Sequence, residues 1–226
     1  MLRTGFLLAA PLLLVVTGPV SAAKYTVKVE DAPPPAEVGN RVRSLLEVKG
    51  LSVYDDAGNV LLTVWPRKAF ESKATAEQVK KGLTYRELEE SDVVGAVKFP
   101  KLWTDYRKQK IKAGVYTLRI GWQPMDGDHM GTAPFNEFCL LSPAAKDQSG
   151  DKMPEKALHE LSAGAVGASH PGVMLLFPNP KPADEPAVES KPNNIWLLNF
   201  KRPVTAAGQK ASLGFSLVVI GQTMSE

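Results

Sequence analysis

The segment QPMDGDHMG, residues 123–131, holds the side chains best suited to chemistry in this sequence. Asp126 and Asp128 offer carboxylate oxygens, His129 offers an imidazole nitrogen, and the glycines let the backbone fold tightly around an ion. Such oxygen and nitrogen donors are typical ligands of calcium, zinc and copper. With His170 as a further ligand, these residues are a candidate site for a metal ion, the one cofactor that the sequence suggests.

The same segment can also be interpreted as a turn that holds no ligand. A calcium loop of the helix–loop–helix kind needs about five ligand positions over twelve residues, ending in a glutamate. The spacing is not diagnostic of zinc, and a copper site would need His159 or His170 from a distant segment. In a turn, the aspartates would accept hydrogen bonds from nearby backbone amides. We favour the turn and keep the metal site as the alternative.

A second group of residues is suited to holding a sugar or an anionic polymer. Residues 98–112 interleave six basic side chains with Trp103 and Tyr106, and such a mixture binds by stacking and by charge. The candidate ligand-binding residues are Trp103, Tyr106, Arg107, Lys108 and Trp122. The alternative is a solvated loop that packs one or two aromatic rings, with the acidic run 87–92 neutralising its charge.

Motifs for catalysis are missing from the sequence. It contains no G-x-S-x-G, no H-E-x-x-H, no phosphate loop and no dinucleotide fingerprint. Carboxylates are plentiful, but paired-carboxylate chemistry depends on their separation in space. We therefore interpret the protein as non-catalytic, and a polysaccharide-active enzyme remains an alternative to which no residues are assigned.

The N-terminus has the three parts of a secretory signal peptide. Arg3 supplies the positive charge, an apolar run of eleven residues follows over 6–16, and small residues place the expected cleavage after Ala22. A membrane span would need about 20 apolar residues. We expect residues 1–22 to be removed. The mature chain, 23–226, would then be periplasmic or extracellular and would have no transmembrane segment.

The composition of the mature chain limits the classes of partner and of fold that are possible. Loss of Arg3 from the 27 basic residues leaves 26 against 24 acidic ones, which argues against nucleic acid as the partner. A length of about 204 residues suits one domain. The single cysteine, Cys139, excludes an intramolecular disulfide, and its apolar neighbours predict that it is buried.

Short runs with period-two alternation, separated by turn residues, predict strands along most of the chain. We expect strands over 25–30, 92–99, 113–122, 136–142, 172–177, 194–200 and 213–221, and a hairpin over 44–66. Capping signals predict short helices over 75–82 and 154–162, with a further turn at 84–87. Residues 178–192 read as a proline-rich polar loop. These elements predict an all-β fold, an antiparallel β-sandwich of the jelly-roll or immunoglobulin-like kind.

The first arm of the expected hairpin changes phase. Leu46 and Val48 lie on one face of an extended chain, but Leu51 and Val53 fall on the opposite face. A bulge at Gly50 would absorb one residue and turn all four side chains inward.

The stretch IKAGVYTLRIGWQPMDGDHMGTAPFNEFCLL, residues 111–141, resembles part of a group of uncharacterised exported β-rich proteins of planctomycete-like and acidobacterial bacteria. In these proteins, a strand of the AGVYTLR type leads into a QPxDGDHMG loop and then into a strand that begins with EF. The resemblance implies a β-rich fold and a recurring loop, and it implies no chemistry.

Taken together, the residues indicate an exported binding or scaffolding module. Its partner would be an envelope component, a glycan or another protein. Metal binding through the 125–131 loop is the alternative from a different class.

Overall fold

The structure is a computed structural model, and it describes residues 25–124, 127 and 131–223. The predicted signal peptide, 1–22, lies outside this range. Within the described residues, no helix combines the length and the apolarity needed to cross a membrane.

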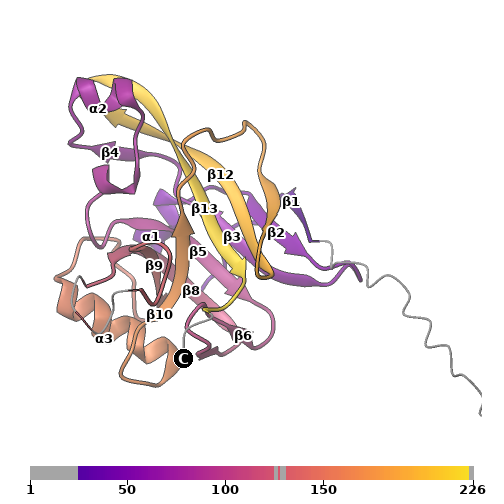
Figure 1. Ribbon diagram of the computed structural model, residues 1–226. Coiled ribbons are helices and arrows are strands. Elements are labelled where there is room, and N and C mark those ends of the chain that lie inside the picture. The colour runs from indigo at the N-terminus through magenta and orange to yellow at the C-terminus, as the bar shows by residue number, and fades with distance from the viewer. Residues whose placement is uncertain (1–24, 125–126, 128–130, 224–226) are drawn as a thin grey trace, which may run out of the picture.

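The fold is all-β, as predicted, and is built on one curled sheet (Figure 1). Neighbouring strands run antiparallel, except that β4 pairs in parallel with β12. The strands of this sheet are β1 (Thr26–Glu30), β2 (Gly50–Tyr54), β3 (Val60–Pro66), β4 (Phe70–Ser72), β5 (Val93–Phe99), β8 (Gly114–Trp122), β9 (Glu137–Pro143), β10 (Gly172–Phe177), β11 (Ala187–Lys191), β12 (Ile195–Ala206) and β13 (Gln209–Ile220). A separate small ribbon pairs β6 (Trp103–Thr104) with β7 (Lys110–Ile111).

The strands follow the order β1-β2-β3-β5-β8-β9-β10-β13-β12-β11, with β4 off this path. A sandwich would divide them between two sheets facing each other, whereas here hydrogen bonds connect every neighbour along one path. The sandwich part of the prediction is therefore not confirmed.

The sheet curls until its two edge strands, β1 and β11, come into contact. Tyr25, next to β1, and Trp196, in β12, meet there edge to face with ring centroids 4.8 Å apart. The long β12–β13 hairpin crosses β3 and β5 (Figure 1). The main core fills the inside of the curl with apolar side chains from most of the strands, including Leu62, Val97, Leu118, Leu141, Met174, Phe200 and Phe215.

Strands β9 and β10 are buried on both faces. Cys139, Leu141 and Met174 belong to the main core, whereas Leu140 and Val173 belong to a second core on the outer face. That outer face is covered by α3 (Glu155–Val166). Cys139 has no exposed surface, which confirms its prediction as a buried small side chain, and burial raises the pKa of its thiol far above the ordinary value.

The predicted helices are present, and one further helix was not predicted. In α2 (Ala76–Lys81) and in the 3-10 turn Tyr85–Glu87, both capping boxes form as the sequence indicates. Helix α3 continues beyond the predicted end at 162, to Val166. The unpredicted helix is α1 (Asn40–Leu45), which lies before β2.

The bulge expected at Gly50 is wrong. The strand begins at this residue, and the preceding chain forms α1 instead of a hairpin arm. Leu46 is buried and Val48 is 63% exposed, so the phase conflict disappears because the two sets of residues do not share a strand. The glycine instead permits a close approach, because a Cβ there would lie 2.7 Å from the Thr63 methyl group.

The C-terminal half of the sheet contains more strand than the sequence indicated. Strand β11 lies in the segment predicted as a polar loop. Strands β12 and β13 extend to a two-residue connection at Ala207 and Gly208, whose φ angles of 49° and 71° are both positive. Two positive φ values are characteristic of a tight hairpin turn whose twist matches that of its strands.

Candidate functional site

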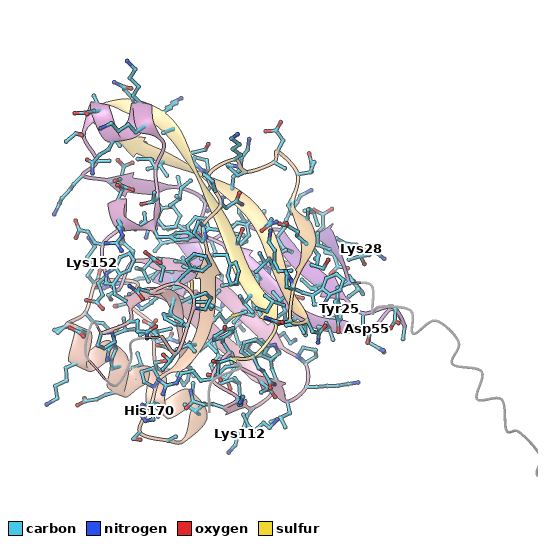
Figure 2. The ribbon with its side chains drawn as sticks, in the orientation of Figure 1. Tyr25, Lys28, Asp55, Lys112, Lys152 and His170 are labelled. Atoms are coloured by element: carbon cyan, nitrogen blue, oxygen red, sulfur yellow. The ribbon has the colours of Figure 1, made fainter. Side chains whose placement is uncertain are left out.

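A cavity of about 270 Å³ lies where the β6–β7 turn, the end of β8, the strand pair β9–β10 and α3 meet. Its lining includes aromatic, basic, amide and imidazole side chains: Tyr106, Arg107, Trp122, Gln123, His159 and His170. His170 lies near one end of the molecule, beside α3 (Figure 2). Four larger cavities lack this combination of residues. Those of about 370 and 510 Å³ have neither histidine nor tryptophan in their linings, that of about 620 Å³ has His159 but neither tryptophan nor tyrosine, and that of about 300 Å³ has Trp103 but no histidine. The smaller cavity is therefore the candidate functional site.

The floor of this cavity is apolar and its rim is polar. Phe138, Leu140 and Val173 supply the floor, since they point to the outer face of β9 and β10. His159 is half-buried at the rim, and His170 is exposed. A concave apolar surface with a few convergent polar groups is the usual form of a small-molecule site.

The turn that carries Tyr106 and Arg107 is held in place by Asp105. Its fully buried carboxylate accepts hydrogen bonds from the backbone N–H of Gln109 at 2.7 Å and from that of Val173, in β10, at 3.2 Å. Burial raises the pKa of Asp105, and these hydrogen bonds oppose the rise. The turn is thereby fixed to the strand that forms the cavity floor.

Beside the cavity, Glu90, Glu155 and His159 bring one possible ligand atom each to within 4.8 Å of one another. Glu155 and His159 are four residues apart on α3 and so share a face of the helix. Glu90 comes from the segment before β5, and its carboxylate accepts a hydrogen bond from the backbone N–H of Trp122. Burial and then the charge of Glu155 raise the pKa of Glu90, against the opposing effects of His159 and of this hydrogen bond.

A buried network holds the Glu90 segment against the start of α3. The Arg119 guanidinium donates to the backbone oxygens of Ser91, at 2.7 Å, and Asp151, at 2.9 Å. The Ser91 hydroxyl in turn accepts the backbone N–H of Met153, at 3.0 Å. Ser91 follows Glu90 in the chain, and Met153 lies two residues before Glu155. The network therefore fixes the approach of the two glutamates.

The cavity is lined by some residues of each predicted site. Three residues of the predicted ligand-binding group line it, namely Tyr106, Arg107 and Trp122. One residue of the predicted metal group, His170, lines it as well. Lys108 is exposed in the same turn and does not line the cavity. Asp126, Asp128 and His129 lie outside the described residues.

Trp103 is separated from this group. It is 9% exposed, its ring stacks on that of Phe99 with centroids 4.7 Å apart, and its indole N–H donates to the backbone oxygen of Val219 at 3.0 Å. Trp103 is therefore a core side chain, in agreement with the alternative in which this loop packs one or two aromatic rings.

Among the described residues, no ion pair joins the acidic run 87–92 to the basic segment 98–112, so the neutralisation proposed in the alternative for this segment is not seen. Glu89 pairs with Lys152 and, at 2.7 Å, with Lys73, whereas Glu87 caps the turn that begins at Thr84. Sequence reasoning also missed Glu90 and Glu155 as site residues. The four-residue spacing of Glu155 and His159 on an expected helix was the available signal.

Comparisons with known proteins found no similarity that bears on function. No family model matches the chain, and neither a curated protein nor a solved structure matches it. The resemblance over residues 111–141 therefore stays a prediction.

Proposed function

We propose that this protein is an exported, non-catalytic binding module whose cavity holds an acidic unit of a glycan. The observation that supports the proposal is the convergence of Tyr106, Arg107 and Trp122 on one concave surface. Tyr106 and Arg107 come from the β6–β7 turn and Trp122 from the end of β8, and these two segments meet only in the folded chain.

Each of these side chains has a defined part in the proposal. The half-buried Trp122 side chain packs partly against the main core, and in the proposal the part that lines the cavity is the apolar surface on which a sugar ring stacks. The Tyr106 ring extends this apolar wall. The Arg107 guanidinium is exposed at the rim and pairs with a carboxylate of the sugar through two parallel hydrogen bonds. Export places the module where such polysaccharides occur.

The test compares acidic and neutral oligosaccharides by calorimetry and by tryptophan fluorescence. We expect the protein to bind an oligouronate of four to six units more tightly than a neutral gluco-oligosaccharide of the same length. Trp122→Ala should weaken binding of the acidic ligand by about tenfold, because one stacking contact contributes about 1–3 kcal/mol. Arg107→Gln should remove the preference for the acidic ligand.

Lys112→Gln is the matched control, because Lys112 is an exposed basic residue of the same segment (Figure 2) and does not line the cavity. It should bind as the unaltered protein does. Absence of binding to either oligosaccharide, or unchanged binding by Trp122→Ala, would overturn the proposal and favour an envelope or protein partner.

A further inference from the structure

We propose that Glu90, Glu155 and His159 form a binding site for a divalent transition metal, with Zn²⁺ as its simplest occupant. One donor atom from each residue lies within 4.8 Å of the other two. Zinc bound to carboxylate oxygens and an imidazole nitrogen lies about 2.0–2.2 Å from each ligand, so small side-chain rotations would bring all three into contact with one ion.

The backbone already holds these side chains near one another. Glu155 and His159 project from one face of α3, a twelve-residue helix. Glu90 is held on the opposite side by the Trp122 backbone N–H and by the Arg119 network that joins Ser91 to the start of the helix. Such pre-positioning lowers the cost of ordering ligands around an ion.

The charge of the cluster also favours a cation. Among the described residues, neither Glu90 nor Glu155 forms an ion pair with a lysine or an arginine. The neighbouring acids differ, since Lys152 pairs with both Glu89 and Asp92. In the part of the chain that the structure describes, the two carboxylates converge with His159 and with no lysine or arginine, and a divalent ion would balance their charge.

The donor set suits a borderline transition metal better than calcium. Calcium takes six to eight oxygen ligands, whereas an imidazole with two carboxylates is an ordinary zinc environment. Three protein ligands leave a fourth position open for water or for a ligand group. His159 also lines the candidate cavity, so this open position would adjoin it.

Metal binding to the full mature chain tests the proposal directly. After removal of bound metal with a chelator and dialysis, titration with Zn²⁺ should show one equivalent bound. Titration with Co²⁺ should give the visible absorption of a low-coordinate site, and Zn²⁺ should abolish it. Glu90→Gln, Glu155→Gln and His159→Gln should each weaken Zn²⁺ binding by about tenfold or more.

Two matched variants separate this site from its neighbours. Glu160→Gln alters an exposed acid on the same helix that pairs with Lys156, and His170→Gln alters the other histidine of the cavity. Both should bind Zn²⁺ as the unaltered protein does. Circular dichroism of every variant should show an unchanged fold, since the three ligands are exposed or half-buried.

The site is excluded if the unaltered protein takes up no stoichiometric Zn²⁺, or if His170→Gln abolishes uptake while His159→Gln does not. Glycan binding by Trp122 and Arg107 does not depend on this result, because the metal ligands are different residues.

Discussion

Arg119 and Asp147 form a two-point ion pair in the interior of the protein. The Nε and Nη2 atoms of the guanidinium each lie 2.7 Å from a different carboxylate oxygen, and the two side chains are 0% and 1% exposed. Thr117 donates a further hydrogen bond to the same carboxylate. The Nη1 atom donates to the backbone oxygens of Ser91 and Asp151, so the buried charges are paired and well hydrogen-bonded.

Asp147→Ala should destabilise the protein strongly. The substitution would leave the Arg119 guanidinium buried without its counter-charge, at a cost of about 3–5 kcal/mol in the free energy of unfolding. Urea denaturation followed by circular dichroism measures this change. Glu77→Gln, which breaks the exposed pair with Lys81 on α2, is the control and should change the free energy by less than about 0.5 kcal/mol. Equal effects of the two substitutions would contradict the structural role of the buried pair.

Two glycine-to-alanine substitutions should shift stability in opposite directions. A Cβ at Gly95 would lie 2.6 Å from the backbone oxygen of Trp65, so Gly95→Ala should cost about 1–3 kcal/mol as the strands move apart. A Cβ at Gly164, inside α3, meets nothing within 4 Å, and Gly164→Ala should add about 0.5–1 kcal/mol by favouring the helix. Thermal melts of both variants measure these changes in stability. A stabilising Gly95→Ala would refute the close approach of β3 and β5.

Glu89 should contribute a pH-dependent part of the stability. Hydrogen bonds from Lys152 and then Lys73 lower the pKa of Glu89 from 4.5 to about 2. The folded state therefore binds fewer protons than the unfolded state between these values. The stabilisation is complete above about pH 4.5 and is lost as the pH falls towards 2.

Melting temperatures of the unaltered protein and of Glu89→Gln, recorded from pH 7 down to pH 2, measure this contribution. The difference between the two should be constant above pH 4.5 and should shrink below it. Because Glu89 is near the surface, added salt should reduce the difference throughout. A difference that grows on acidification would contradict the assignment.

Cys139 should be protected from thiol reagents in the folded protein. The side chain has no exposed surface, and burial disfavours the reactive thiolate. In native buffer, a chromogenic disulfide reagent should react at least about a thousandfold more slowly than in guanidinium chloride, because reaction requires the core to open. Immediate stoichiometric reaction without denaturant would show that β9 is not buried on both faces.

Local sequence patterns predicted most of the elements, because capping and alternation act over a few residues. The capping box at Thr75 and the strands on either side of residues 123–131 are examples. The same patterns could not distinguish a sandwich from one curled sheet, since a strand buried on both faces has a similar composition in either architecture. Strand order depends on contacts between distant segments, and a single sequence does not reveal these.

The residues of the candidate site could likewise be predicted only in part. Aromatic and basic residue types drew attention to Tyr106, Arg107 and Trp122, and the fold brings these side chains to one cavity. Trp103 lies in the same basic and aromatic segment, but its indole packs into the core. The direction of each side chain depends on the turn that Asp105 fixes, and the sequence does not show that turn. Glu90 is held beside α3 by the Arg119 network and by the Trp122 backbone N–H, and no spacing in the sequence indicates these contacts.

The shape of the sheet has a consequence for the order of folding. The ladder between β12 and β13 closes across a connection of two residues, so little chain entropy opposes its formation. Contact between β1 and β11 requires segments separated by most of the chain to meet, and such distant pairings form slowly. We expect the hairpin to act as an early template on which the rest of the sheet assembles, with the two edges meeting last.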